Sequence, residues 1–319
     1  MTKAISLGVV SALFFSSTFV LNRVMRLDGA SLWWISSLRY LFTAPILAVV
    51  VWRRKGWKSL WLDFVVRPWP WILWGTIGFG LFYLPLTWVA RWAPAWLVAS
   101  SWQLTIVAGS LLVPVIGGVS SQDRHLPIVA LWPSLLILVG VGITEWSVAT
   151  LAGAGIWWAL IPVSGAAIAY PLGNRQMMRY ARTFGPFDVY QRTLGMTLGS
   201  LPFWAVVAGI GASTVGPPSG SETLYTLVVA LLAGVVATLL FFAATDLSQG
   251  RAMWLARIEA SQSMEIVFTV LLSSILFGAA WPDGFGKIGM AIIIAGMIWH
   301  SLSSSVRQEK SHLKSNVIG

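Results

Sequence analysis

Ten long runs of apolar residues follow one another along the chain, separated by short segments that hold most of the charged residues. Each run approaches the ~20 apolar residues that an α-helix needs to cross a bilayer. Proline, glycine and charged residues mark the ends of the runs. The pattern predicts ten transmembrane helices, at 4–22, 31–52, 70–90, 94–117, 126–146, 154–173, 186–210, 223–243, 252–278 and 284–304.

A different pattern follows the second run, at 53–69, where a basic cluster precedes apolar residues at helical spacing. The apolar positions recur at i, i+3, i+4, i+7 and i+8, on one face of a helix: Trp57, Leu60, Trp61, Phe64 and Val65. The charged residues lie off this stripe. The pattern predicts a short amphipathic helix over 56–67 that lies on the cytoplasmic membrane surface as a connector, with lipid sensing as the alternative.

Lysine and arginine residues are distributed unequally between alternate connecting segments. If both termini are cytoplasmic, fourteen of the 21 lie in inside segments, three lie within spans, and four lie outside: Arg23, Arg26, Arg91 and Lys287. The positive-inside rule therefore predicts that both termini are cytoplasmic, with a tail over 307–319. The first run lacks the small-residue exit of a cleaved signal peptide, so it is expected to remain as a span.

Composition agrees with an all-α integral membrane protein. Of 319 residues, 57% are hydrophobic and 10% are charged, whereas a soluble domain carries roughly 25% charged residues. The net charge of +10 does not indicate nucleic-acid binding, because the basic residues lie between the apolar runs. The chain has no cysteine and only three histidines, which offer no ligand set for a metal, so no metal site and no cofactor are expected.

Two sequence features of the first half recur in the same order in the second half. An Asn-Arg motif closes the first run at 22–26 and the sixth run at 174–179. Arg39 and Arg192 each follow the last arginine of these motifs by 13 residues. The common order and spacing indicate an internal duplication.

A third match aligns 99–107 with 259–267 and completes two related halves, 1–150 and 151–306. Each half contains five predicted spans. Because five is an odd number, the second half must enter the membrane from the opposite side. The sequence therefore predicts an inverted-topology repeat, in which a substrate binds near the membrane midplane between the halves.

This arrangement resembles the drug/metabolite transporter superfamily, whose ten-span members consist of two five-helix halves with both termini cytoplasmic. The segments 259–268 and 289–297 are similar to its multidrug resistance efflux transporter branch. In the broader superfamily a Gly-Glu pair often ends the ninth span, whereas this chain has Phe277-Gly278-Ala279 there. The resemblance implies a secondary transporter in a bacterial cytoplasmic membrane.

The ninth predicted span is unusually polar for a membrane helix. Charge within a bilayer is costly, so this span is expected to contact protein or water rather than lipid. Glu265, Glu259 and Gln262 are predicted to bind a proton or a substrate, because a buried carboxyl group tends to stay protonated near neutral pH. For Glu259 the alternative is an ion pair with an arginine of a neighbouring span that only locks the bundle.

The fourth predicted span is the counterpart of the ninth and carries Trp102 and Gln103. We expect Gln103 to face Gln262 or Glu265 across a cavity. Trp102 is predicted either to stack on a planar or cationic ligand or simply to pack in the bundle.

The remaining intramembrane charges are predicted to form structural ion pairs. Asp188 precedes Arg192 by four residues, a spacing that allows a local ion pair on a helix. Arg39, the repeat counterpart of Arg192, and Arg257 of the ninth span are expected to lock the bundle in the same way.

These features together predict proton-coupled efflux of small amphipathic or cationic organic compounds by alternating access, by a monomer or homodimer. The partners expected are the small-molecule substrate, protons and the lipid bilayer. A metabolite exporter or importer of the same fold, for amino acids or nucleobases, is the nearest alternative. Two other classes of function are less favoured. A membrane-embedded enzyme would need a histidine or acidic cluster beside an aqueous face, and a channel would need a ring of charges.

Overall fold

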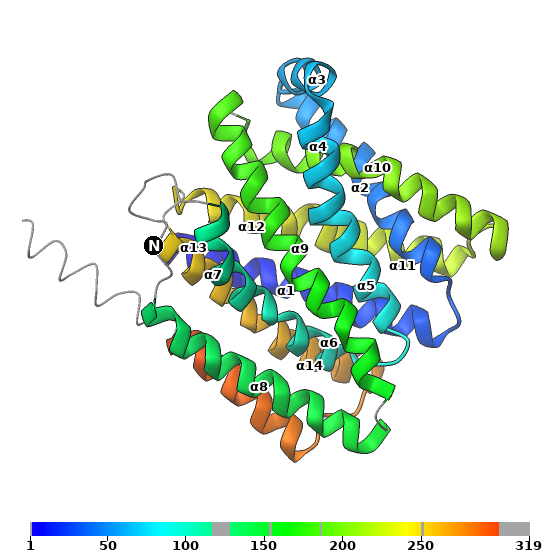
Figure 1. The fold of residues 1–319 in the computed structure, drawn as a ribbon. Helices are drawn as coiled ribbons and strands as arrows, with labels where there is room; N and C mark the ends of the chain where they lie inside the picture. The colour runs from blue at the N-terminus through cyan, green and yellow to red at the C-terminus, as the bar shows by residue number, and fades with distance from the viewer. Residues whose placement is uncertain (1, 117–127, 153–154, 186, 250–251, 300–319) are drawn as a thin grey trace, which may run out of the picture.

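The computed structural model describes residues 2–116, 128–152, 155–185, 187–249 and 252–299, and in this part of the chain every regular element is a helix. Figure 1 shows long helices packed into one bundle. Six helices in the described residues are long and apolar enough to cross a membrane: Thr2–Leu27, Leu32–Arg53, Pro68–Val89, Val189–Thr214, Gly220–Asp246 and Arg257–Phe277. Two shorter apolar helices are Leu135–Trp146 and Gly284–Trp299. The predicted tail at 307–319 lies outside the described residues.

Several long helices are continuous. They are α1 (Thr2–Leu27), α2 (Leu32–Arg53), α8 (Ile128–Ala152), α9 (Gly155–Phe184) and α10 (Val189–Thr214). Helix α9 continues past 173, where the sixth apolar run ends, because one face of its extension still packs against protein. The buried residues of this face are Asn174, Met177, Met178 and Ala181. Arg175, which the charge pattern assigns to a connecting segment, is therefore a buried helical residue.

Four other helical stretches are interrupted near their middle. A π-helical turn, Thr76–Gly80, joins α4 (Pro68–Gly75) to α5 (Leu81–Val89), and a second, Ala230–Ala237, joins α11 (Gly220–Val229) to α12 (Thr238–Asp246). Gln103 separates α6 (Ala95–Trp102) from α7 (Leu104–Ile116), and a 3-10 turn, Ser261–Ser263, separates α13 (Ala252–Ala260) from α14 (Met264–Phe277). Interruptions of this kind are frequent at functional sites.

The helices pack in a reciprocal pattern. α1 contacts α12 and α14, whereas α9 contacts α5 and α7, and α2 packs along α10. The contact between α9 and the first π-helical turn is close enough to require glycine, because a Cβ atom on Gly173 would lie 2.5 Å from Cα of Gly78. Small residues that let helix backbones approach are typical of membrane bundles.

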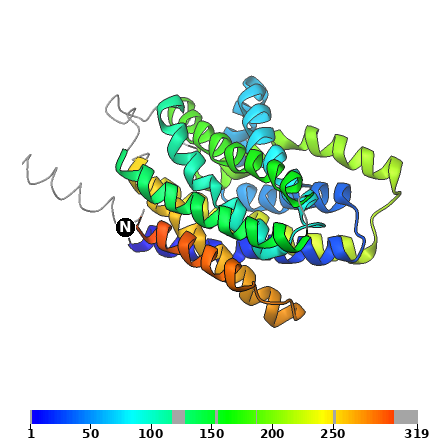
Figure 2. The same ribbon diagram turned by 60° about the horizontal axis from the view of Figure 1, so that its bottom comes forward.

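One flank of the bundle is formed by α8 and the last described helix, Gly284–Trp299. Both views show them side by side (Figure 1 and Figure 2). Their apolar contact includes Ile137 and Val141 on α8 and Ile293 and Met297 on the last helix. Ile106 and Ile266 belong to the same buried cluster, which joins this flank to α7 and α14.

The amphipathic segment forms a short helix, α3 (Trp57–Val66). Leu60 is buried, whereas Trp61 and Val65, assigned to the same stripe, are exposed at 49% and 59%. Asp63 attaches the helix to the bundle, because its carboxylate accepts hydrogen bonds from the indole N–H of Trp71 (2.9 Å) and the hydroxyl of Tyr180 (2.7 Å).

Candidate functional site

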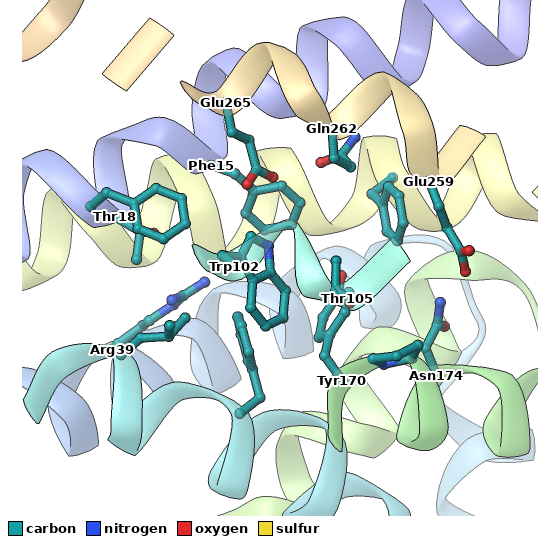
Figure 3. A pocket seen from close by; sticks show the side chains of 15 residues that line it. Phe15, Thr18, Arg39, Trp102, Thr105, Tyr170, Asn174, Glu259, Gln262 and Glu265 are labelled. Atoms are coloured by element: carbon teal, nitrogen blue, oxygen red, sulfur yellow. The ribbon is translucent and has the colours of Figure 1, made fainter. Parts of the chain in front are cut away.

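A cavity lies between helices from both halves of the chain and is here called the central cavity (Figure 3). Its volume is about 30 Å³ for water-sized molecules, enough for roughly two of them. Fifteen residues line it: Phe15, Thr18, Phe19, Arg39, Phe82, Leu86, Trp102, Thr105, Tyr170, Pro171, Asn174, Phe241, Glu259, Gln262 and Glu265. In the described part of the chain, no three acidic, histidine or cysteine side chains gather closely enough to hold a metal ion.

Glu265 is the acidic residue of this cavity that forms no ion pair within the described part of the chain. It lies in the first turn of α14, directly after the 3-10 turn, and is 2% exposed. Its Oε2 atom makes no hydrogen bond. Gln103, at the break between α6 and α7, lies near this carboxyl group, and its Nε2 atom donates to the carbonyl oxygen of Ala99 (3.0 Å). Gln103 is not among the residues that line the cavity, so its expected part in binding stays a prediction.

Glu259 differs from Glu265 because its charge is neutralised within the protein. Both of its carboxylate oxygens lie 2.8 Å from Nη2 of Arg175, and both side chains are 9% exposed. Nη1 of Arg175 donates to the carbonyl oxygen of Gly109. Gly109 leaves room for this contact, since a Cβ atom there would lie 2.8 Å from Nη2 of Arg175 and would displace the guanidinium group. Glu259 thus forms an ion pair with a neighbouring helix, which is the alternative to proton or substrate binding that its sequence position allows.

Gln262 connects the 3-10 turn to α1. Its Nε2 atom donates to the carbonyl oxygen of Gly8 (2.9 Å), and its Oε1 atom makes no hydrogen bond. The amide therefore holds the interrupted helix in place with one end and leaves an acceptor unsatisfied beside the cavity.

Trp102 forms part of an aromatic wall. Its ring centroid lies 4.9 Å from that of Phe82 and 5.6 Å from that of Tyr170. Tyr170 in turn contacts Phe241 at 6.0 Å. The packing role and the ligand-facing position considered for Trp102 are therefore compatible, because the packed ring also lines the cavity.

Arg39 lines the cavity without an ion-pair partner. Its guanidinium group lies over the ring of Tyr83, 4.1 Å from the centroid. Its Nε and Nη1 atoms make no hydrogen bonds, although the residue is only 2% exposed. No ion pair joins it to a carboxylate among the described residues. The expected structural ion pair of Arg39 is thus not found.

Arg192 has a different partner from the one that its sequence spacing suggests. It binds Asp246 of α12, with 2.6 Å between Nη1 and Oδ1. Asp188 is instead the N-cap of α10 and accepts a hydrogen bond from the backbone N–H of Gln191 (2.8 Å). Its other oxygen, Oδ2, lies 3.7 Å from Nε of Arg54 at the end of α2, so Asp188 pairs with a different arginine from the one expected.

Arg257 also departs from the expected pairing. It is buried on α13, its Nε and Nη2 atoms make no hydrogen bonds, and the described residues provide it with no ion pair.

Sequence reasoning missed two polar residues of α9 at the site. Asn174 lines the cavity with an unsatisfied Oδ1 atom, and Arg175 neutralises Glu259. Both belong to the motif 174–179, which the duplication had already singled out. Its first-half counterpart Asn22 accepts a hydrogen bond from the hydroxyl of Tyr83 (3.0 Å).

Comparison with known proteins identifies a family, two sequence relatives and a solved structure that resemble this chain. The model of a family described as "Putative multidrug resistance efflux transporter" matches residues 2–306. The chain is 41% identical to "Uncharacterized protein YjlA" of Bacillus subtilis (strain 168), over 99% of both chains. It is 43% identical to an "Uncharacterized 42.1 kDa protein in intracellular alkaline protease 3'region" of Shouchella clausii, over 82% of this chain and 70% of that one. A solved structure, "Crystal structure of protein", has the same fold, with a TM-score of 0.66 over 95% of this chain and 99% of that one at 16% identity.

Proposed function

The chain belongs to the multidrug resistance efflux transporter family, and from this premise we propose that it is a proton-coupled secondary transporter that exports small organic solutes by alternating access. The family is one of multi-pass membrane proteins that move small molecules. Proton coupling, the outward direction, the bacterial cytoplasmic membrane, the cytoplasmic termini and a monomeric or homodimeric state are parts of this proposal.

Matching irregularities in the two halves support ten spans arranged as two inverted five-helix repeats. Helical residues occupy the described part of each of the ten apolar runs. The third and eighth stretches both contain a π-helical turn, and the fourth and ninth both break near their middle. The first helix of each half also packs against the other half: α1 contacts α12 and α14 of the second half, and α9 contacts α5 and α7 of the first half. A two-fold axis in the membrane plane would produce this pattern.

The observation that carries the coupling proposal is the buried carboxyl group of Glu265, with one oxygen unbonded, at the wall of a cavity between the halves. The charged or titratable groups that share the cavity are Arg39, Tyr170 and the neutralised Glu259. A carboxylate without a cationic partner is costly in a membrane, so a proton or the cationic group of a substrate would occupy it. Competition between the two for one carboxyl group is enough to couple their movements.

Bonds at both ends of the bundle would have to open in turn for alternating access. At the end that we assign to the outside, Arg23 donates to the carbonyl oxygen of Ala90 (3.0 Å) and Trp34 to that of Gly216 (2.7 Å). At the opposite end, Gln191 donates to the carbonyl oxygen of Gly56 (2.8 Å). Opening one set of bonds while the other stays closed would expose the cavity to one side of the membrane at a time.

Transport by purified protein in proteoliposomes, with and without an imposed pH gradient, tests the proposal. Glu265→Gln keeps the size of the side chain and fixes a neutral form. We expect this variant to lose accumulation driven by the pH gradient and to retain downhill exchange. Glu145→Gln is the matched control, because Glu145 lies on α8 outside the cavity. Full activity of Glu265→Gln with the pH dependence of the wild type would remove Glu265 from the mechanism.

A further inference from the structure

We propose that the central cavity binds a small zwitterion, whose carboxylate lies against Arg39 and whose ammonium group lies against Glu265. The proposal rests on the transport function above and names its class of solute. The two residues come from α2 and α14, in different halves of the chain, and both line the cavity. Figure 3 shows their polar ends directed into the same space.

Arg39 has the properties of an anion-binding residue without its anion. A guanidinium group carries five N–H donors, and those on Nε and Nη1 make no hydrogen bond here. The ring of Tyr83 covers one face of the guanidinium, which leaves its edge to receive a ligand. Because burial of an unpaired charge is unfavourable, a carboxylate that reached this edge would form a strong, two-pronged contact.

Arg39 and Glu265 together also favour a ligand of both charges over a ligand that carries a single charge. They are not joined to each other by any of the ion pairs of the described residues. A simple amine would be attracted to Glu265 but repelled by Arg39, and a simple carboxylate would meet the opposite problem. A ligand with one group of each sign is attracted at both positions.

The rest of the cavity fits an apolar or aromatic body. Six aromatic side chains line it: Phe15, Phe19, Phe82, Trp102, Tyr170 and Phe241. Thr18 Oγ1 and Asn174 Oδ1 make no hydrogen bonds and add polar positions for the ligand. The narrow volume favours a small solute and requires the helices to separate on loading, as alternating access would provide.

Two sets of related compounds test the charge requirement directly. One set is phenylalanine, 2-phenylethylamine and 3-phenylpropionate, and the other is leucine, 3-methylbutylamine and 4-methylpentanoate. Within each set the body is the same, and either the carboxylate or the ammonium group is missing. In equilibrium binding to purified protein, we expect at least one amino acid to bind about tenfold or more tightly than both of its truncated analogues, because each analogue leaves a buried charge unpaired. Equal or tighter binding of the amines, or no binding by either amino acid, would overturn the proposal.

Variants assign each charged group of the ligand to a residue. Arg39→Gln should weaken amino-acid binding about tenfold while leaving amine binding unchanged or stronger, and Glu265→Gln should weaken amino-acid binding while sparing the acids. Arg39→Lys keeps the charge and should retain part of the preference for the carboxylate. Arg53→Gln, an exposed arginine at the end of the same helix, is the control and should change nothing. Equal losses for all three compounds in Arg39→Gln would contradict the assignment.

Parallel transport assays separate this proposal from the function on which it rests. Amine transport in proteoliposomes that is insensitive to Arg39→Gln would leave the transporter proposal standing and refute the zwitterion. Amino-acid binding without any transport would support the zwitterion site and refute the transporter proposal.

Discussion

Arg39 and Arg192 occupy corresponding places in the two halves of the molecule but have different surroundings. Each lies in the second helix of its half and is almost fully buried, at 2% and 3% exposure. Each guanidinium group lies over an aromatic ring, that of Tyr83 at 4.1 Å and that of Phe242 at 4.8 Å. Among the residues that the structure describes, Arg192 forms an ion pair with Asp246, whereas Arg39 forms none.

The difference follows from one position in the neighbouring helix. Asp246 lies four residues beyond Phe242, and the residue four beyond Tyr83 is Thr87. The second half therefore neutralises its arginine within the protein, whereas the first half leaves Arg39 exposed to the cavity. A buried charge with a protein partner stabilises the fold, whereas a buried charge without one is available to a ligand.

The largest effect on stability should come from breaking the fully buried pair of Arg175 and Glu259. Arg175→Gln leaves a carboxylate without compensation, so we expect a loss of about 3–5 kcal/mol in the free energy of unfolding. Thermal unfolding in detergent, followed by tryptophan fluorescence, measures it. The double variant with Glu259→Gln should recover part of the loss. An unchanged midpoint for Arg175→Gln would show that the pair does not hold the bundle.

A smaller effect is expected at the partly exposed pair. Asp246 is 36% exposed, so solvent can partly replace it as a partner of Arg192. We therefore expect Asp246→Asn to lower the free energy of unfolding by about 1 kcal/mol. The loss should decrease as salt is added, because an exposed charge is screened. A loss as large as that of Arg175→Gln would show that solvent near Asp246 does not compensate the buried charge of Arg192, and it would contradict the ranking.

The smallest effect on stability is expected for Arg39→Gln, although it is as deeply buried as Arg192. This substitution removes a charge that no protein group compensates, so the free energy of unfolding should change by less than about 1 kcal/mol or increase. The same unfolding measurement checks it. A loss of several kcal/mol would mean that Arg39 holds the fold in the way that Arg175 does.

Hydropathy and spacing predicted the class of fold, because a bilayer requires long apolar helices and the positions of these can be counted along a sequence. The alignment of the two halves predicts that Gln103 faces Gln262 or Glu265 across the cavity. Gln262 and Glu265 line the cavity, whereas Gln103 does not, and its Nε2 atom donates to the carbonyl oxygen of Ala99. The alignment fixes where a residue lies along its helix, but not the direction of its side chain.

Ion pairing could not be predicted in the same way. Asp188 has the right spacing for Arg192, yet the start of α10 at Val189 makes it a helix cap. The apolar run ends at 173, so hydropathy assigns Arg175 to a connecting segment. This assignment is wrong because α9 continues eleven residues further, from 173 to Phe184. Which carboxylate an arginine reaches depends on helix ends and on the rotation of neighbouring helices, and neither follows from hydrophobic periodicity.

The central claim, that a substrate and a proton compete for Glu265, can be measured as proton release on ligand binding. Saturating 2-phenylethylamine or phenylalanine is added to the purified protein in weakly buffered detergent solution near neutral pH, and a pH-sensitive dye records the protons released. The account predicts release of up to about one proton per bound ligand from the wild type and none from Glu265→Gln. Ligand binding without proton release from the wild type, or equal release from Glu265→Gln, would contradict it.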